Sequence, residues 1–360
     1  MSKKITIGIS HGDVNGISYE VILKSLEDSR LLDLCTPIIY GSPKVAAYHK
    51  KALNMEVINF NSIRVAMEAA HKRVNIINCI DDNIRVELGK STKQAGESSF
   101  LALKSATQDL KGELVDALVT GPINKQNIQS DNFRYSGHTE YLMDIFGVDD
   151  VLMLMVSEYI KIGVVAGHVP ISQLSAFITE QRVLSKIRIL NQSLQKDFNI
   201  PKPKIAVLGL NPHAGDEGLI GDEEQQLIIP AINEAKKQNN LVFGPFPADG
   251  FFGSGAFAKY DGILAMYHDQ GLIPFKTISR DEGVNYTAGL PVVRTSPAHG
   301  TAYEIAGKGE ASPTSFRNAI YLACDIIRNR ALYDEIHANP LHSTYNSGSD
   351  NDDDINDLTE

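Results

Sequence analysis

The segment 114–125 reads Leu114-Val115-Asp116-Ala117-Leu118-Val119 followed by Thr120-Gly121-Pro122-Ile123-Asn124-Lys125, a largely apolar run that passes at once into turn-forming and polar residues. The run lacks strict alternation of apolar and polar positions, which predicts a strand covered on both faces. Similar runs lie at 5–9, 37–41, 162–166, 205–208 and 262–266, separated by helical patterns at 18–26, 97–110, 181–198 and 223–238. This alternation predicts an α/β fold with a largely parallel sheet.

Residues that can bind a ligand follow most of these runs at the point where the run ends. The clusters are Ser10-His11-Gly12-Asp13, Gly167-His168-Val169-Pro170, Asn211-Pro212-His213-Ala214-Gly215-Asp216 and Tyr267-His268-Asp269-Gln270-Gly271. Open α/β sheets bind ligands outside the carboxyl ends of their strands. The clusters therefore predict one shared site.

Bulk composition limits the classes of protein that the chain can represent. A length of 360 residues suggests two domains or one large one. The net charge of -10 argues against nucleic-acid binding. No apolar run reaches the roughly 18 residues of a membrane span, and no secretory signal is visible. Three widely spaced cysteines argue against a disulfide framework, so we expect a cytoplasmic protein.

Three of the ten histidines, His168, His213 and His268, directly follow predicted buried strands. Three imidazoles that converge at strand ends would suit a divalent transition metal, Zn²⁺ above all, with one position open for a substrate. The alternative is three separate histidines that cap strand ends through hydrogen bonds. Spacings of this length are not diagnostic, so both interpretations stay open on the residues alone.

Other polar residues are candidates for catalysis and for phosphate binding. Asp249 and Asp269 could orient a ligand, act as a base, or cap a helix. Lys276, Asn285 and Arg294 offer two cations and an amide, a combination that suits a phosphate group. A solvated loop with unrelated charges is the alternative. The chain has no P-loop, no dinucleotide-binding glycine fingerprint after its first strand and no nucleophile elbow.

Several segments together resemble the 4-hydroxythreonine-4-phosphate dehydrogenase family of vitamin B6 biosynthesis. They run in family order up to about residue 325 and include 119–125 together with Gly137-His138-Thr139-Glu140-Tyr141-Leu142, Leu210-Asn211-Pro212-His213-Ala214-Gly215-Asp216, Gly244-Pro245-Phe246-Pro247-Ala248-Asp249, Tyr267-His268-Asp269-Gln270-Gly271 and Arg294-Thr295-Ser296-Pro297-Ala298-His299-Gly300-Thr301-Ala302. The loop at 11–18 departs from the usual family pattern, because Asp13 stands where a glutamate is common and the proline is missing.

The resemblance implies a two-domain α/β/α fold of the isocitrate and isopropylmalate dehydrogenase type, with its active site in the cleft between domains. The first domain would combine residues 1–120 with 285–345, and the second would span 121–284 and carry the contacts of a homodimer. Residues 346–360 are acidic and are typical of a disordered tail.

The resemblance also implies an activity. This is the metal-dependent oxidation of 4-phosphohydroxy-L-threonine to 2-amino-3-oxo-4-phosphooxybutanoate with NAD or NADP, followed by decarboxylation. A related enzyme for another small phosphorylated hydroxy acid is one alternative, and a non-catalytic metabolite-binding protein is another.

The resemblance assigns roles to individual residues. The metal ligands would be His168, His213 and His268, drawn from two subunits, with Zn²⁺, Mg²⁺ or Co²⁺ as the ion. Substrate would contact His138, Thr139, Lys276, Asn285 and Arg294, and the candidate catalytic residues are Asp249, Asp269 and Lys276.

The stretch 299–309 is similar to the adenosine-binding loop of isopropylmalate dehydrogenases, which implies cofactor contacts from His299, Gly300, Glu304 and Ile305. A carboxylate at Glu304 would accept hydrogen bonds from ribose hydroxyls and repel a 2′-phosphate, so we expect NAD to be preferred over NADP. The alternative is that Glu304 merely opens a helix.

Overall fold

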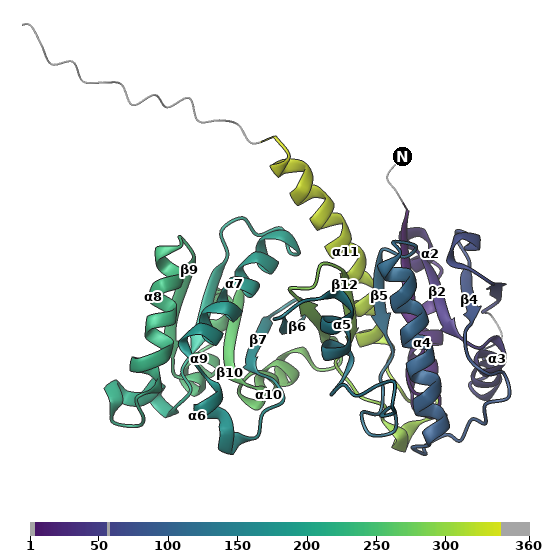
Figure 1. Ribbon diagram of the computed structural model, residues 1–360, viewed down its shortest axis with the longest axis horizontal. Helices are drawn as coiled ribbons and strands as arrows, with labels where there is room; N and C mark the ends of the chain where they lie inside the picture. The colour runs from purple at the N-terminus through teal and green to yellow at the C-terminus, as the bar shows by residue number, and fades with distance from the viewer. Residues whose placement is uncertain (1–3, 56–57, 340–360) are drawn as a thin grey trace, which may run out of the picture.

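The computed structural model describes residues 4–55 and 58–339, and within them twelve strands form one sheet (Figure 1). Along the sheet the order is β3 (Phe60–Ile63), β4 (Val74–Asn78), β2 (Cys35–Gly41), β1 (Ile5–Ser10), β5 (Ala117–Thr120), β12 (Val293–Pro297), β11 (Val284–Ala288), β6 (Leu152–Val156), β7 (Lys161–Ala166), β10 (Gly262–Tyr267), β8 (Lys204–Leu208) and β9 (Leu241–Phe246). All six runs expected to be strands are strands.

Two parallel groups of strands make up the sheet, and they run in opposite directions. β3, β4, β2, β1, β5 and β12 are parallel to one another, as are β7, β10, β8 and β9. Between the groups, β11 is antiparallel to β12 and to β6, and β6 is antiparallel to β7. The expected α/β fold with a largely parallel sheet is therefore confirmed, with a reversal of direction at its centre.

The principal helices are α1 (Ser18–Leu26), α3 (Pro43–Ala52), α4 (Lys93–Lys111), α5 (His138–Phe146), α7 (Glu180–Lys196), α8 (Ile229–Lys237), α10 (His268–Ser279) and α11 (Thr314–His337). Shorter ones are α2 (Leu31–Leu34), α6 (Leu174–Phe177) and α9 (Ala248–Gly253). Side-chain caps set several starting points: Thr92 accepts a hydrogen bond from the backbone N–H of Ala95, and Thr179 accepts one from that of Arg182. The helices expected at 18–26, 97–110 and 181–198 are confirmed, and the pattern at 223–238 forms a π-helical turn followed by α8.

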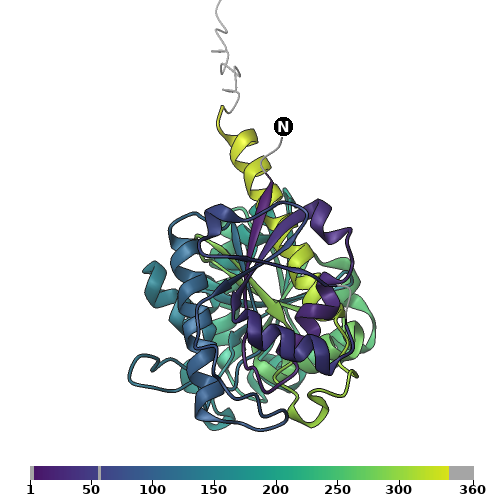
Figure 2. The same cartoon turned by 90° about the vertical axis from the view of Figure 1, so that its right-hand side faces the viewer.

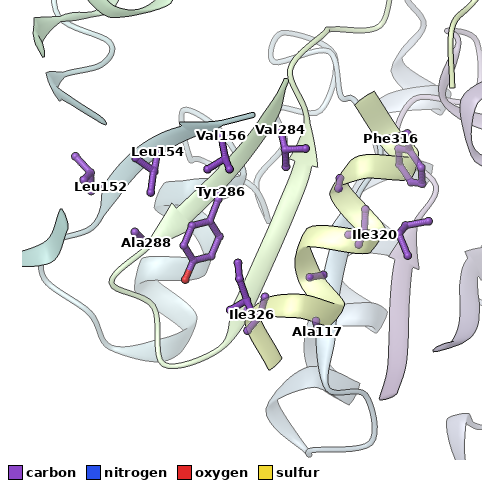
Figure 3. Close-up of a cluster of buried hydrophobic side chains, with 14 of the residues drawn as sticks. Ala117, Leu152, Leu154, Val156, Val284, Tyr286, Ala288, Phe316, Ile320 and Ile326 are labelled. Carbon is purple, nitrogen blue, oxygen red and sulfur yellow. The ribbon is translucent and has the colours of Figure 1, made fainter. Parts of the chain in front are cut away.

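One face of the sheet carries a core that continues across both halves. Its side chains come from β1, β6, β11 and β8 and pack against α1, α11, α7 and α8. Figure 3 shows the middle of this core, where Leu154, Val156 and Tyr286 lie on the side of the strands that faces α11. This face is closed by helices from one end of the sheet to the other.

The opposite face has two separate cores instead of one. In the N-terminal half, α4 and α5 cover β2 and β5, so that α4 and α11 lie on opposite sides of these strands (Figure 2). In the C-terminal half, α9 and α10 cover β7, β8 and β10. Neither core spans the centre of the sheet, where β6, β11 and β12 present their second face to a cavity.

The continuous sheet does not itself mark a domain boundary, so the division of residues 1–120 and 285–345 from 121–284 stays a prediction. The expected acidic tail at 346–360 lies outside the described residues. None of the helices within 4–55 and 58–339 combines the length and apolar character needed to cross a bilayer. The three cysteines are free thiols.

Candidate active site

A polar cavity of about 300 Å³ lies over the uncovered face at the centre of the sheet. Both halves of the chain line it. From the N-terminal strand group come the loop after β5, with Gly121 and Lys125, and the end of β12. From the other group come His168, after β7, and His268, which begins α10 directly after β10. Loops that follow strands of both groups therefore line one cavity.

Arg294, on β12, forms part of the floor and is only 3% exposed. Its Nε and one terminal nitrogen donate to the Thr120 hydroxyl at 3.1 and 2.7 Å, and the other terminal nitrogen donates to the Thr287 hydroxyl at 3.1 Å. Burial lowers the pKa of Arg294 to about 10, so the guanidinium keeps its charge at neutral pH. Two of its five N–H groups remain for a ligand.

Two further polar groups in the cavity are buried without a hydrogen-bond partner among the described residues. They are the Oδ1 atom of Asn285, on β11, and the Nε2 atom of His138, the first residue of α5. Burial, and then the charges of Arg294 and Lys125, hold the pKa of His138 well below its usual value, so this imidazole is neutral. A buried polar atom left unpaired is costly, which indicates that a polar ligand completes both bonds. Thr139 does not line the cavity.

His168 and His268 face each other across the cavity, with ring centroids 6.4 Å apart. The Nδ1 atom of His268 lies 2.8 Å from Asp269 Oδ1, and His168 Nε2 lies 3.2 Å from Lys125 Nζ. Burial, and then the charge of Lys125, lower the pKa of His168. An aspartate on Nδ1 can fix the tautomer of a histidine and leave its Nε2 available to a ligand.

His213 and Asp249 lie elsewhere, in a larger and mainly apolar cavity of about 780 Å³ that Asp269 also lines. His213 is exposed and lies in a short turn in which six consecutive residues have positive φ. Within the part of the chain that the structure describes, no group of three His, Cys, Asp or Glu side chains is arranged to hold a metal ion. The described residues therefore place no third ligand beside His168 and His268, and the three-histidine site, which would draw on a second subunit, stays a prediction.

A third cavity of about 360 Å³ adjoins the polar one, and the two share the residues Lys276, Ala298 and His299. Its lining also includes Ile305 and Arg280. The Nε2 atom of His299 is buried without a hydrogen-bond partner in the described part of the chain. Burial also lowers the pKa of His299, so a neutral imidazole stands in the wall between the two cavities.

The residues expected to bind the cofactor are only partly brought together. His299 lies in the shared wall and Ile305 in the adjoining cavity, whereas Gly300 lines the polar cavity. Glu304 is exposed and is not among the residues that line the adjoining cavity. The Glu304 assignment therefore has no geometric support from the cavity lining and stays a prediction.

Four residues in or beside the two adjoining cavities were not identified as candidates from the sequence. Thr120 holds Arg294, and Lys125 and Glu140 lie beside His168, with Glu140 Oε1 4.0 Å from His168 Nδ1. Arg280 lines the adjoining cavity. The first three occur in the segments 119–125 and 137–142 that carry the resemblance, so position in a motif could have identified them. Arg280 had no such signal.

The fold and the cavities define an α/β protein with a polar, cation-lined cleft at the centre of its sheet. A family model described as pyridoxal phosphate biosynthetic protein PdxA matches residues 33–323. A protein from Bacteroides thetaiotaomicron named 4-hydroxythreonine-4-phosphate dehydrogenase is 50% identical over 351 residues, which cover 97% of this chain and 96% of the relative. The chain belongs to the PdxA family.

Two further relatives show the fold of the family and the different substrates that appear in the names of its members. The crystal structure of a 4-hydroxythreonine-4-phosphate dehydrogenase from Klebsiella pneumoniae has a TM-score of 0.79 and 33% identity, and covers 91% of this chain and 98% of its own. This likeness confirms the expected fold class. A relative from Clostridium botulinum is 37% identical over 90% of this chain and 97% of its own, and bears a provisional name, D-threonate 4-phosphate dehydrogenase.

Proposed function

We propose that the chain oxidises 4-phosphohydroxy-L-threonine to 2-amino-3-oxo-4-phosphooxybutanoate with NAD⁺ or NADP⁺, that the product then loses CO₂, and that this reaction serves pyridoxal phosphate biosynthesis. One observation carries the proposal beyond family membership: the polar cavity and the adjoining cavity share a wall formed by Lys276, Ala298 and His299. Hydride transfer needs the substrate carbon and the nicotinamide ring in contact. Two cavities that adjoin at shared residues can hold the substrate and the nicotinamide side by side.

The floor of the polar cavity supports a phosphorylated substrate. Arg294 retains two N–H groups and a charge, and Lys276 adds a second cation from α10. Guanidinium groups bind phosphate through paired hydrogen bonds. The unpaired Oδ1 of Asn285 and the neutral imidazole of His138 suit the hydroxyl and amine of the same molecule.

A divalent metal ion fits the facing pair of histidines. We propose that His168 and His268 bind it together with His213 of a second copy of the chain, and that the active unit is a homodimer. Zn²⁺ is our first choice, with Mg²⁺ or Co²⁺ as alternatives. Such an ion would lower the pKa of the substrate hydroxyl as a Lewis acid. Lys276, Asp269 and Asp249 are the residues we propose for proton transfer or for orienting the ligands.

The provisional name of the Clostridium relative makes a second substrate, D-threonate 4-phosphate, the specific alternative. The two substrates differ at carbon 2, where one carries an amine and the other a hydroxyl. Purified protein, supplied with each compound, NAD⁺ and one of Zn²⁺, Mg²⁺ or Co²⁺, is expected to reduce NAD⁺ fastest with 4-phosphohydroxy-L-threonine. Faster turnover of D-threonate 4-phosphate would favour the alternative. Binding of either compound without reduction would identify a metabolite-binding protein.

Glu304 provides a test of the cofactor loop. We expect the wild type to prefer NAD⁺, and Glu304→Lys to shift the ratio of kcat/KM towards NADP⁺ by about five- to tenfold, since a lysine attracts a 2′-phosphate that a carboxylate repels. Steady-state kinetics with both cofactors measure the ratio. Glu335→Lys makes the same change of charge on an exposed residue of α11 and should leave the ratio as it is. A wild type that prefers NADP⁺ would contradict this assignment.

A further inference from the structure

Asp13, in the loop that departs from the usual family pattern, is a fully buried carboxylate with no part in the proposed chemistry. It lines neither the polar cavity nor the adjoining one. Its Oδ1 accepts a hydrogen bond from the backbone N–H of Asn15 at 2.9 Å. Its Oδ2 accepts one from the Tyr303 hydroxyl at 2.7 Å and one from the Asn127 amide at 2.8 Å. A buried carboxylate is stable only when hydrogen-bond donors surround it. The Asp13 carboxylate therefore fixes the positions of its three donors relative to one another.

Tyr303 belongs to the segment 299–311, which we call the cofactor loop because His299, Ala302 and Ile305 line the adjoining cavity. The tyrosine follows Asp13 by 290 residues in the sequence, so this hydrogen bond joins the N-terminal segment to a loop in the C-terminal part of the chain. Burial, followed by the hydrogen bond to Asp13, raises the pKa of Tyr303 to about 12. The phenol therefore stays protonated at neutral pH and can donate to the carboxylate.

The same N-terminal segment holds the cofactor loop at further points. The backbone N–H of Ile17 donates to the carbonyl of Thr301 at 3.0 Å. A Cβ on Gly16 would lie 2.6 Å from that carbonyl oxygen, so the approach requires a glycine. Beyond the loop's centre, Lys24 Nζ donates to the carbonyl of Ala311 at 2.8 Å. Among these contacts, the bond from Tyr303 to Asp13 is the one between two side chains.

We infer that Asp13, acting through Tyr303, positions the cofactor loop for binding of the dinucleotide. The inference rests on the proposed function, because it assigns the adjoining cavity to NAD⁺. Asp13 contributes no group to substrate or cofactor, so it is a positioning residue. Its loss should weaken cofactor binding while the groups that surround the substrate stay in place.

The test is Tyr303→Phe, which removes one oxygen atom and keeps the ring. The KM for NAD⁺ should rise about five- to tenfold, less than the roughly tenfold or more expected for losing a direct hydrogen bond to a charged group, because Tyr303 acts on the cofactor only through the loop. Both kcat and the KM for 4-phosphohydroxy-L-threonine should change less than about twofold, since the polar cavity is not altered. Calorimetric titration of NAD⁺ into the enzyme without substrate should show the same loss of affinity as the KM.

Asp13→Asn is the matching change on the acceptor side. An amide has the shape of the carboxylate but turns an NH₂ towards one of the donors, so the NAD⁺ affinity should fall by a similar factor. The double variant should bind NAD⁺ no more weakly than the weaker single variant, because both changes break the same bond. If the two losses simply multiply, the residues act separately and the inference is overturned.

Tyr40→Phe is the matched control. The Tyr40 hydroxyl also donates to a carboxylate, Asp109, at 2.6 Å, but between β2 and α4 and away from both cavities. The Tyr40→Phe substitution should leave the NAD⁺ affinity unchanged. An NAD⁺ affinity in Tyr303→Phe equal to that in Tyr40→Phe would overturn the inference, as would equal losses in kcat and both KM values. A wild type that binds no NAD⁺ would instead refute the proposed function.

Discussion

His168→Ala and His268→Ala are each expected to lower kcat by about a thousandfold or more, the rate equivalent of losing several kcal/mol of charge stabilisation from a metal ion. The fold should survive, because the side chains are 50% and 43% exposed. Kinetics with saturating Zn²⁺ measure kcat, the metal content of the purified protein measures metal binding, and the thermal unfolding temperature tests whether the fold is kept. His337→Ala, an exposed histidine in the last turn of α11, is the control. Wild-type rates in either site variant would exclude the metal site.

The proposed sharing of the metal between subunits has its own test. His213→Ala should be as inactive as His268→Ala, although His213 lies in a different cavity of its own chain. Co-expressing these two inactive variants should restore activity. If half of the dimers are mixed and each keeps one intact site, about a quarter of the wild-type activity should return. No recovery in mixed dimers of confirmed composition would show that the three histidines do not act across the subunit contact.

Removal of the Arg294 charge should have the second large effect. Arg294→Met keeps most of the buried volume but removes the two N–H groups left for phosphate, so kcat/KM for 4-phosphohydroxy-L-threonine should fall about a hundredfold. The unphosphorylated analogue, 4-hydroxy-L-threonine, should lose less than about threefold if Arg294 acts on the phosphate alone. Arg294→Ala should show the same selectivity with an added loss of stability from the cavity it creates.

Thr287→Val separates phosphate binding from simple support of the guanidinium. It removes one hydrogen bond to Arg294 but leaves the charge in place. The ratio of kcat/KM for the phosphorylated substrate to that for the unphosphorylated one should therefore change little in Thr287→Val. The same ratio should fall strongly in Arg294→Met. Equal losses for both substrates in Arg294→Met would mean that the residue does not bind phosphate.

Local sequence pattern was sufficient where strands are covered by helices on both faces. The runs at 5–9, 162–166 and 262–266 are continuous in apolar residues because both of their faces are buried, and they appear as β1, β7 and β10. By contrast, β11 and β12, with the sequences VNYTA and VRTSP, were not predicted. Their polar residues Asn285 and Arg294 face the cavity, so the strands that build the site lack the apolar pattern.

The sequence by itself determined the α/β class and the kinds of side chain that the site uses, because the apolar pattern and the motif spacing are local properties of the chain. The placement of those side chains depended on the tertiary structure. The rule for strand ends predicted that all three histidines would meet, since β7, β8 and β10 are parallel, but only His168 and His268 do, while His213, in the positive-φ turn after β8, lies in another cavity. The bond between Asp13 and Tyr303 likewise joins residues 290 positions apart, and no local pattern encodes such a contact.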